Sequence, residues 1–204
     1  MSDLMELRLA AQEIFGEALR AVDPAAAIRE KLRVNGSRLV VCDTEFEGGP
    51  LLNVFGIAIG KASERMSYEV EKVFGDGFLT GVLSGPRRVF GWEYFEGGHP
   101  LPNEASLDAA KAAIHLLKMA DHENSLIVFM ISGGGSAMFE LPSTDEITLN
   151  DLRAANETLV GCGASISEVN AVRRAFSAVK GGRLATFAPK SRQLTLIVSD
   201  VPKG

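Results

Sequence analysis

A run of three glycines between two serines is the part of this sequence best suited to bind an anion. Six apolar residues precede it, from Leu126 to Ile131. Such a short run, rich in β-branched and aromatic side chains, is typical of a strand buried on both faces in a parallel sheet. Ligands bind beyond the carboxyl ends of such strands, and glycine lets the backbone approach them and offer N–H groups. We therefore predict a backbone anion site, although a tight turn without a ligand would also use glycine. Its residues are Ser132, Gly133, Gly134, Gly135 and Ser136.

A second candidate for anion binding is the pair Gly60-Lys61, which lies where a predicted strand meets a predicted helix. A helix N-terminus favours anions, and a lysine there adds a charge to the amide donors. The alternative is a surface lysine that starts a helix. The sequence contains no P-loop, GxxxxGK[ST], and no GxGxxG that opens a helix.

His99 lies between Gly98 and Pro100 in a long loop that is rich in glycine and proline. A histidine in such a loop can bind substrate or transfer a proton, and it can equally do no more than anchor the loop by hydrogen bonds. His115 and His122 fall on or near a polar helix face, and no pair of histidines has the spacing of metal ligands.

Further candidates follow in the last third of the chain. Asn170 and Arg173 are three residues apart and share one helix face, although a solvated face is the ordinary interpretation of such residues. Lys180-Gly181-Gly182 can form a second anion-binding turn. Asp200 follows a predicted strand, where a carboxylate can hold Mg²⁺ or take a proton in phosphoryl transfer; it could also be a helix N-cap.

The elements that position these residues alternate between strand and helix. Apolar runs predict strands over 39–42, 53–60, 78–83, 125–131 and 194–198. Periodicity and caps predict helices over 5–21, 24–35, 61–74, 106–119, 148–160 and 165–179, with a loop over 84–104. This order is typical of an α/β fold with a mostly parallel sheet and helices on both faces.

Composition limits the class of protein. The chain has 204 residues, a hydrophobic fraction of 46% and a net charge of −5, with a pI of about 5.3. The charge argues against binding to nucleic acid or to an anionic membrane. No apolar run approaches the roughly 20 residues of a membrane span, so we expect a cytoplasmic protein. Cys42 and Cys162 are far apart, which predicts two reduced core residues and no metal site.

Six motifs occur together in an order that resembles the glycerate 2-kinases, a class sometimes named hydroxypyruvate reductase. The resemblance extends from about residue 4 to residue 204. The motifs are Gly60–Ala62, Gly97–Pro102, Ile131–Ala137, Gly163–Arg173, Lys180–Ala185 and Ser199–Val201.

The resemblance implies ATP-dependent phosphorylation of the 2-hydroxyl of D-glycerate, with Mg²⁺, to give 2-phosphoglycerate. It implies a Rossmann-like N-terminal domain that faces a C-terminal MOFRL domain across the active-site cleft. Lys61 matches the catalytic lysine. The motifs that line the cleft are matched by the Ser132–Ser136 loop, Asn170, Arg173, Lys180 and Asp200. We predict that Asp200 is catalytic and holds Mg²⁺, and that Gly60, His99, Gly181 and Gly182 bind substrate or nucleotide. Family members commonly continue from Ser-Asp-Val into an acidic turn, whereas this chain has Pro202-Lys-Gly204, which weighs against Mg²⁺ at that turn.

The resemblance also predicts that residues 1–204 form a single N-terminal glycerate-kinase-like domain. The C-terminal domain would then be absent, and the site would need that domain or a partner chain to be active; a homodimer is a further possibility. Two other functions remain open. One is an NAD(P)H-dependent hydroxypyruvate reductase, and the other is a non-catalytic ligand-binding lobe.

Overall fold

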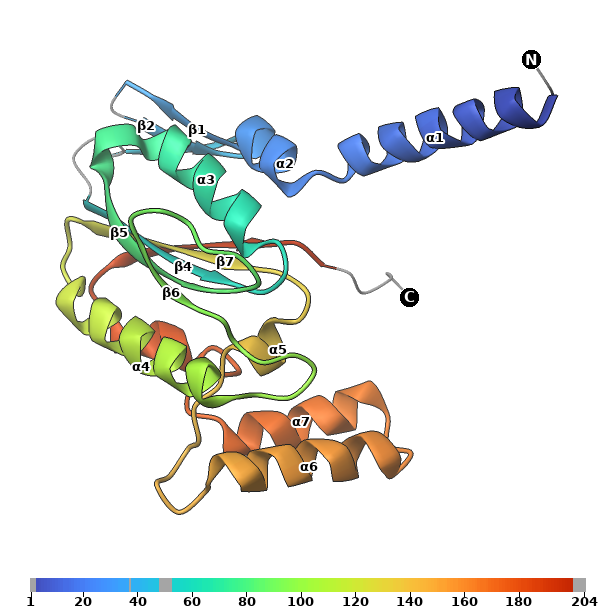
Figure 1. Ribbon diagram of the computed structural model, residues 1–204. Coiled ribbons are helices and arrows are strands. Elements are labelled where there is room, and N and C mark those ends of the chain that lie inside the picture. Colours follow the sequence, from blue (N-terminus) through green and yellow to red (C-terminus); the bar gives the residue numbers. More distant parts are fainter. Residues whose placement is uncertain (1–2, 37, 48–52, 200–204) are drawn as a thin grey trace.

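The computed structural model describes residues 3–36, 38–47 and 53–199, and its centre is a five-stranded parallel sheet (Figure 1). The strand order is β6-β5-β4-β7-β8, and each neighbouring pair is parallel. The strands are β4 (Asn53–Ile59), β5 (Phe78–Ser84), β6 (Trp92–Phe95), β7 (Ser125–Ile131) and β8 (Arg192–Ile197). The predicted α/β, Rossmann-like architecture is confirmed.

The strand order reverses direction between β4 and β7. From β4 the chain moves outward through β5 to β6, and it then returns to add β7 and β8 on the other side of β4. In open α/β sheets this reversal leaves a crevice at the carboxyl ends of the two central strands, because the connections leave toward opposite faces. The residues that follow β4 and β7 therefore come together.

Helices cover both faces of the sheet, as predicted (Figure 1). Alternate residues of β4 explain why: Ile57 and Ile59 pack toward α4, whereas Val54 and Ala58 pack toward α3. After the N-terminal helix α1, which is described below, the helices of the chain are α2 (Pro24–Lys31), α3 (Ser63–Phe74), α4 (Glu104–Met119), α5 (Gly135–Met138), α6 (Leu149–Gly161) and α7 (Ile166–Phe176). Two 3-10 turns lie at Gly75–Gly77 (η2) and Arg183–Phe187 (η3).

The prediction that the helix beginning at Pro24 continues to Asn35 was wrong. That helix, α2, ends at Lys31, and a three-stranded antiparallel sheet follows, made of β1 (Leu32–Asn35), β2 (Arg38–Val41) and β3 (Thr44–Glu47). Asn35 ends β1, and Gly36 follows it in the connection to β2, the antiparallel partner of β1. Gly36 has a φ of +57°. Asn-Gly is a strong hairpin signal because the tightest hairpin turns require positive φ.

Two further expectations need correction. The predicted loop over 84–104 contains the strand β6, whose Trp92 stacks on Phe78 with ring centroids 5.1 Å apart. Trp92 also lies over the sheet so closely that a Cβ on Gly81 would come within 2.3 Å of its ring. Cys42 and Cys162 are exposed, so neither is a core residue.

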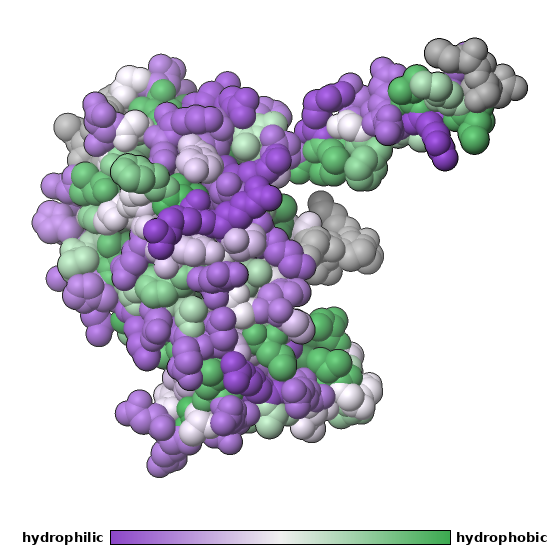
Figure 2. All heavy atoms as spheres, in the orientation of Figure 1, coloured by the Kyte–Doolittle hydropathy of each residue, from purple (hydrophilic) through white to green (hydrophobic). Residues whose placement is uncertain are grey.

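The N-terminal helix α1 (Asp3–Ala21) projects away from the sheet (Figure 1). Its large apolar side chains are exposed, and Figure 2 shows hydrophobic residues along it. They include Leu4, Leu7, Ile14, Phe15 and Leu19. In the part of the chain that the structure describes, no helix combines the length and apolar character needed to cross a membrane.

Candidate active site at the reversal of strand order

The carboxyl ends of β4 and β7 bring the two best sequence motifs side by side. Ile59 pairs with Ile131 in the parallel register, so Gly60-Lys61 and the Ser132–Ser136 loop leave the sheet together. The N–H of Lys61 donates to the carbonyl of Gly133 at 2.9 Å. The two segments that sequence patterns singled out separately therefore form one structural unit.

Gly60 and Ser132 make the scaffold of this unit. The Ser132 hydroxyl donates to the carbonyl of Ile59 at 3.2 Å and accepts from the N–H of Ala62 at 3.0 Å. Gly60 has a φ of +107°, and a Cβ there would lie 2.5 Å from the Ser132 carbonyl oxygen. Both residues are buried. Protein groups already accept from the N–H groups of Lys61 and Ala62, and the Lys61 side chain adds a positive charge at this helix start.

Gly134 brings Lys61 and His99 into one place. It has a φ of +83°, and a Cβ built on it would lie 3.1 Å from His99 Cδ2 and 3.3 Å from Lys61 Cε. The absence of a side chain at this position lets the loop lie close to both functional groups. Lys61 and His99 are both exposed, so a ligand can reach an ammonium and an imidazole at the same point.

The loop that carries His99 is held at two places. The N–H of Gly98 donates to Asn103 Oδ1 and Ser106 Oγ, each at 2.9 Å, and these two residues also form the capping box of α4. Arg153 of α6 donates to the carbonyl of Pro102 at 2.8 Å. The position of His99 is therefore set by a helix cap and a neighbouring helix.

A cavity of about 550 Å³ adjoins this cluster, between the sheet and the segment that follows α7. It contains seven of the predicted residues, while Lys61 and His99 lie outside its lining. The seven are Gly135, Ser136, Asn170, Arg173, Lys180, Gly181 and Gly182. The candidate site thus has two neighbouring parts that share the Ser132–Ser136 loop.

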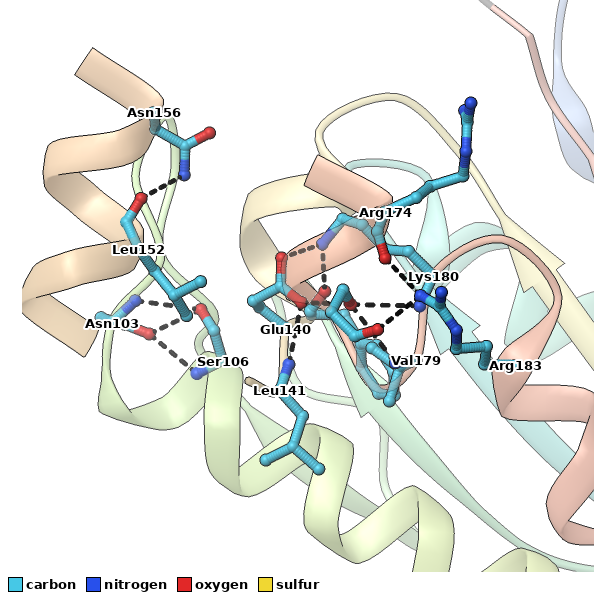
Figure 3. A network of polar contacts seen from close by, with 12 residues as sticks. Asn103, Ser106, Glu140, Leu141, Leu152, Asn156, Arg174, Val179, Lys180 and Arg183 are labelled. Atoms are coloured by element: carbon cyan, nitrogen blue, oxygen red, sulfur yellow. Dashed lines mark hydrogen bonds and ion pairs between the residues drawn. The ribbon is translucent and has the colours of Figure 1, made fainter. Parts of the chain in front are cut away.

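A buried acidic residue that the sequence interpretation missed holds Lys180 in the cavity wall (Figure 3). Glu140 forms an ion pair with Lys180, accepts from the Ser177 hydroxyl at 2.5 Å and accepts from the N–H of Leu141 at 3.0 Å. Burial lowers the pKa of Lys180, although the attraction of Glu140 opposes this shift. A single carboxylate within the apolar stretch Met138–Leu141 was the available signal.

Two arginines of α7 face the same cavity without an ion pair among the described residues. Arg173 Nε is buried and has no hydrogen-bond acceptor in the described part of the chain. Arg174 is exposed, and Figure 3 shows its side chain extending away from the Glu140–Lys180 pair. A buried donor without an acceptor is uncommon, so the wall suits a ligand that supplies acceptor atoms.

The predicted metal site cannot be placed in this structure. Asp200 lies outside the described residues. Within residues 3–36, 38–47 and 53–199, no group of three or more His, Cys, Asp and Glu side chains could hold a metal ion. Glu140, the buried carboxylate beside the cavity, is engaged by Lys180. The Mg²⁺ site at Asp200 therefore stays a prediction.

Comparison with known proteins gives matches over nearly all of the chain. The sequence model of a family described as a domain of unknown function, DUF4147, matches residues 10–204. A Pyrococcus horikoshii protein named glycerate 2-kinase is 37% identical over 199 residues, which cover 97% of this chain and 44% of that protein. An Agrobacterium vitis protein named putative hydroxypyruvate reductase is 38% identical over 200 residues, covering 94% of this chain and 41% of that protein.

Structural similarity agrees with the sequence similarity. The crystal structure of a glycerate kinase from Thermotoga maritima superimposes with a TM-score of 0.74 at 31% identity. The alignment covers 97% of this chain and 45% of that one. The chain thus spans less than half the length of the relatives it matches.

Proposed function

This chain belongs to the DUF4147 family, and we propose that it supplies the amino-terminal part of the active site of an ATP-dependent glycerate 2-kinase. The names of its relatives support this proposal. The observation that carries it is the meeting of Lys61, His99 and Gly134 where the strand order reverses. That is the place where sheets of this kind bind phosphorylated ligands.

The geometry supports a division of roles at this point. The Lys61 ammonium stabilises negative charge that develops on the transferred phosphoryl group, and it does so beside a loop whose shape is fixed in advance. The 2-hydroxyl oxygen of D-glycerate forms a bond to the terminal phosphorus of ATP, the bond to the ADP oxygen breaks, and His99 accepts the hydroxyl proton. Asp200 remains the candidate to orient the hydroxyl.

The proposal includes a second polypeptide region. The relatives are more than twice as long as the segment matched here. Lys61 and His99 are exposed, whereas phosphoryl transfer needs water excluded from the reacting groups. We infer that a further region, on the same chain or on a partner chain, covers these residues in the active cytoplasmic enzyme. Residues 1–204 form the glycerate-kinase-like domain that this region would cover.

A reductase is the second candidate, because relatives such as the Agrobacterium vitis protein carry that name. A hydride transfer would need a nicotinamide cofactor. The turn after β4 and the turn after β7 both lack the GxGxxG pattern that binds a dinucleotide pyrophosphate. The kinase is therefore favoured.

Two assays on one preparation distinguish the candidates. Purified chain is combined with the carboxyl-terminal part of the Pyrococcus horikoshii relative, and ADP release is followed with and without D-glycerate. The kinase predicts release that depends on D-glycerate, with ³¹P NMR showing the phosphate on the 2-oxygen. The reductase predicts loss of NADH absorbance with hydroxypyruvate and no ADP release. The non-catalytic lobe predicts neither signal.

A further inference from the structure

The cavity beside the strand reversal has two apolar walls that face each other. Ile59 and Phe129 come from the sheet, and Val179 and Leu184 come from the segment opposite. Its volume of about 550 Å³ lies within the usual range of small-molecule sites. Walls of this kind suit a flat ring. A three-carbon hydroxy acid has no apolar surface of that size to bury.

The rim of the same cavity carries donors without acceptors. Arg173 Nε is buried and unpaired within the described residues. Gly181 and Gly182 have φ values of +66° and +84°, and their N–H groups donate to no described residue. No atom lies within 4 Å of the position that a Cβ on Gly182 would occupy. Backbone N–H groups on such a turn, in a cavity that Arg173 and Arg174 also line, can bind phosphate oxygens.

We propose that this cavity binds a nucleoside di- or triphosphate, with the base between the apolar walls and the phosphates at Arg173 and the Gly181–Gly182 turn. The hydroxy acid then binds separately, at Lys61 and His99. This assignment rests on the proposed function only in naming the nucleotide as phosphoryl donor.

The Ser132–Ser136 loop connects the two places. Gly135 and Ser136 line the cavity, while a Cβ built on Gly134 would approach both Lys61 and His99. A terminal phosphoryl group that extends from the cavity across this loop would reach the Lys61 ammonium. The proposed places for donor and acceptor therefore adjoin the same loop, and direct transfer requires the two to be near each other.

The first test measures binding of ADP and of D-glycerate to the 204-residue chain by calorimetry. Ala185 lines the cavity and is half-buried, so Ala185→Trp should fill the space for the base. Arg173→Gln should remove the charged side chain that donates hydrogen bonds to the phosphates. We expect each variant to weaken ADP binding at least about tenfold and to leave D-glycerate binding unchanged. Arg20→Gln, on the exposed face of α1, is the matched control and should change neither.

The second test needs no variant and remains valid if Ala185→Trp fails to fold. Amide NMR spectra of the wild-type chain titrated with ADP should show the largest shifts at Gly181, Gly182 and Ala185. D-glycerate should instead shift Lys61 and Gly134. Shifts from ADP confined to Lys61 and Gly134, or no ADP binding at millimolar concentration, would overturn the assignment. ADP binding in the cavity, with no glycerate phosphorylation even after the carboxyl-terminal part of the Pyrococcus horikoshii relative is added, would keep the assignment and reject the kinase.

Discussion

Lys61 is the residue whose removal should affect chemistry most and stability least. Its side chain is exposed and makes no ion pair with a described residue. Loss of one donor aimed at transition-state charge typically lowers kcat by about 10²–10³-fold. We expect Lys61→Ala to show a loss of this size in the proposed kinase once the carboxyl-terminal part is supplied, with an unchanged melting temperature.

The control for Lys61 is Lys111→Ala on the exposed surface of α4, where Lys111 pairs with Asp108 at 3.3 Å. It should retain wild-type turnover. Near wild-type turnover in Lys61→Ala would remove Lys61 from the mechanism.

Gly134 should tolerate no side chain. Its φ of +83° is strained for any L-residue, and even a Cβ would press on His99 and Lys61. We expect Gly134→Val to cost about 1–3 kcal/mol of stability and to weaken D-glycerate binding by more than this loss alone would explain. Calorimetry on the folded variant checks the second effect, with Gly161→Ala as control because that position is open and its φ is not positive. Unchanged affinity in Gly134→Val would make the loop a simple turn.

Some residues of the candidate site could be predicted from the sequence, and others could not. Gly134 and Lys61 were predictable because glycine runs and strand–helix junctions carry local signals. Glu140 was not, because its importance comes from Lys180, forty positions away, and from burial that only the folded chain creates. The roles of both groups remain predictions.

Among the contacts that join α2 to α3, one ion pair involves a buried carboxylate. Arg29 donates to Glu69 at 2.8 Å, and the Glu69 side chain is 6% exposed. This hydrogen bond holds the pKa of Glu69 below its ordinary value, against the opposing effect of burial. A lowered carboxyl pKa adds stability above the unfolded value of about 4.3. That stability is lost as the pH falls through the folded value.

Arg29→Met should therefore destabilise the chain at neutral pH, because Glu69 loses its main partner. The difference from wild type should shrink as the pH falls through the lowered pKa of Glu69. Urea unfolding at a series of pH values measures this. Arg38→Met removes an ion pair with Glu45 in which both partners are more than half exposed, so its effect should be small at every pH. A deficit for Arg29→Met that stays constant into acid would contradict the ion-pair explanation.

The parallel sheet was predictable because β4 and β7 are buried on both faces and read as continuous apolar runs. The small sheet was not, since Leu32–Asn35 follows a helix without a break and is only four residues long. Its pairing with β2 is what selects the extended form. Capping boxes located the start of α7 correctly at Ser165, because that signal is local.

In the molecule as a whole, α1 projects from the folded domain and leaves its apolar side chains exposed. Its apolar side chains, such as Ile14 and Phe15, are 71% and 65% exposed. A helix without tertiary packing is marginal in water and opens at little cost in free energy. We expect amides of α1 in the isolated chain to exchange with deuterium far faster than those of α4 and β7. Protection of α1 equal to that of β7 would show that another surface, such as a second copy of the chain, already covers it.

By itself, the 204-residue chain should fold without showing kinase activity. The sheet has its own core on both faces, so residues 1–204 should fold alone and unfold cooperatively. Lys61 and His99 are nevertheless open to water. A ligand that is contacted by only one of two covering regions has fewer contacts, and water is not excluded from the reacting groups. We therefore expect the 204-residue chain to bind ADP weakly and to phosphorylate D-glycerate at no detectable rate. A coupled assay for ADP release, on protein of verified mass, measures this. Robust glycerate-dependent release from the chain alone would show that these residues form a complete active site, and the proposal of a second covering region would fail.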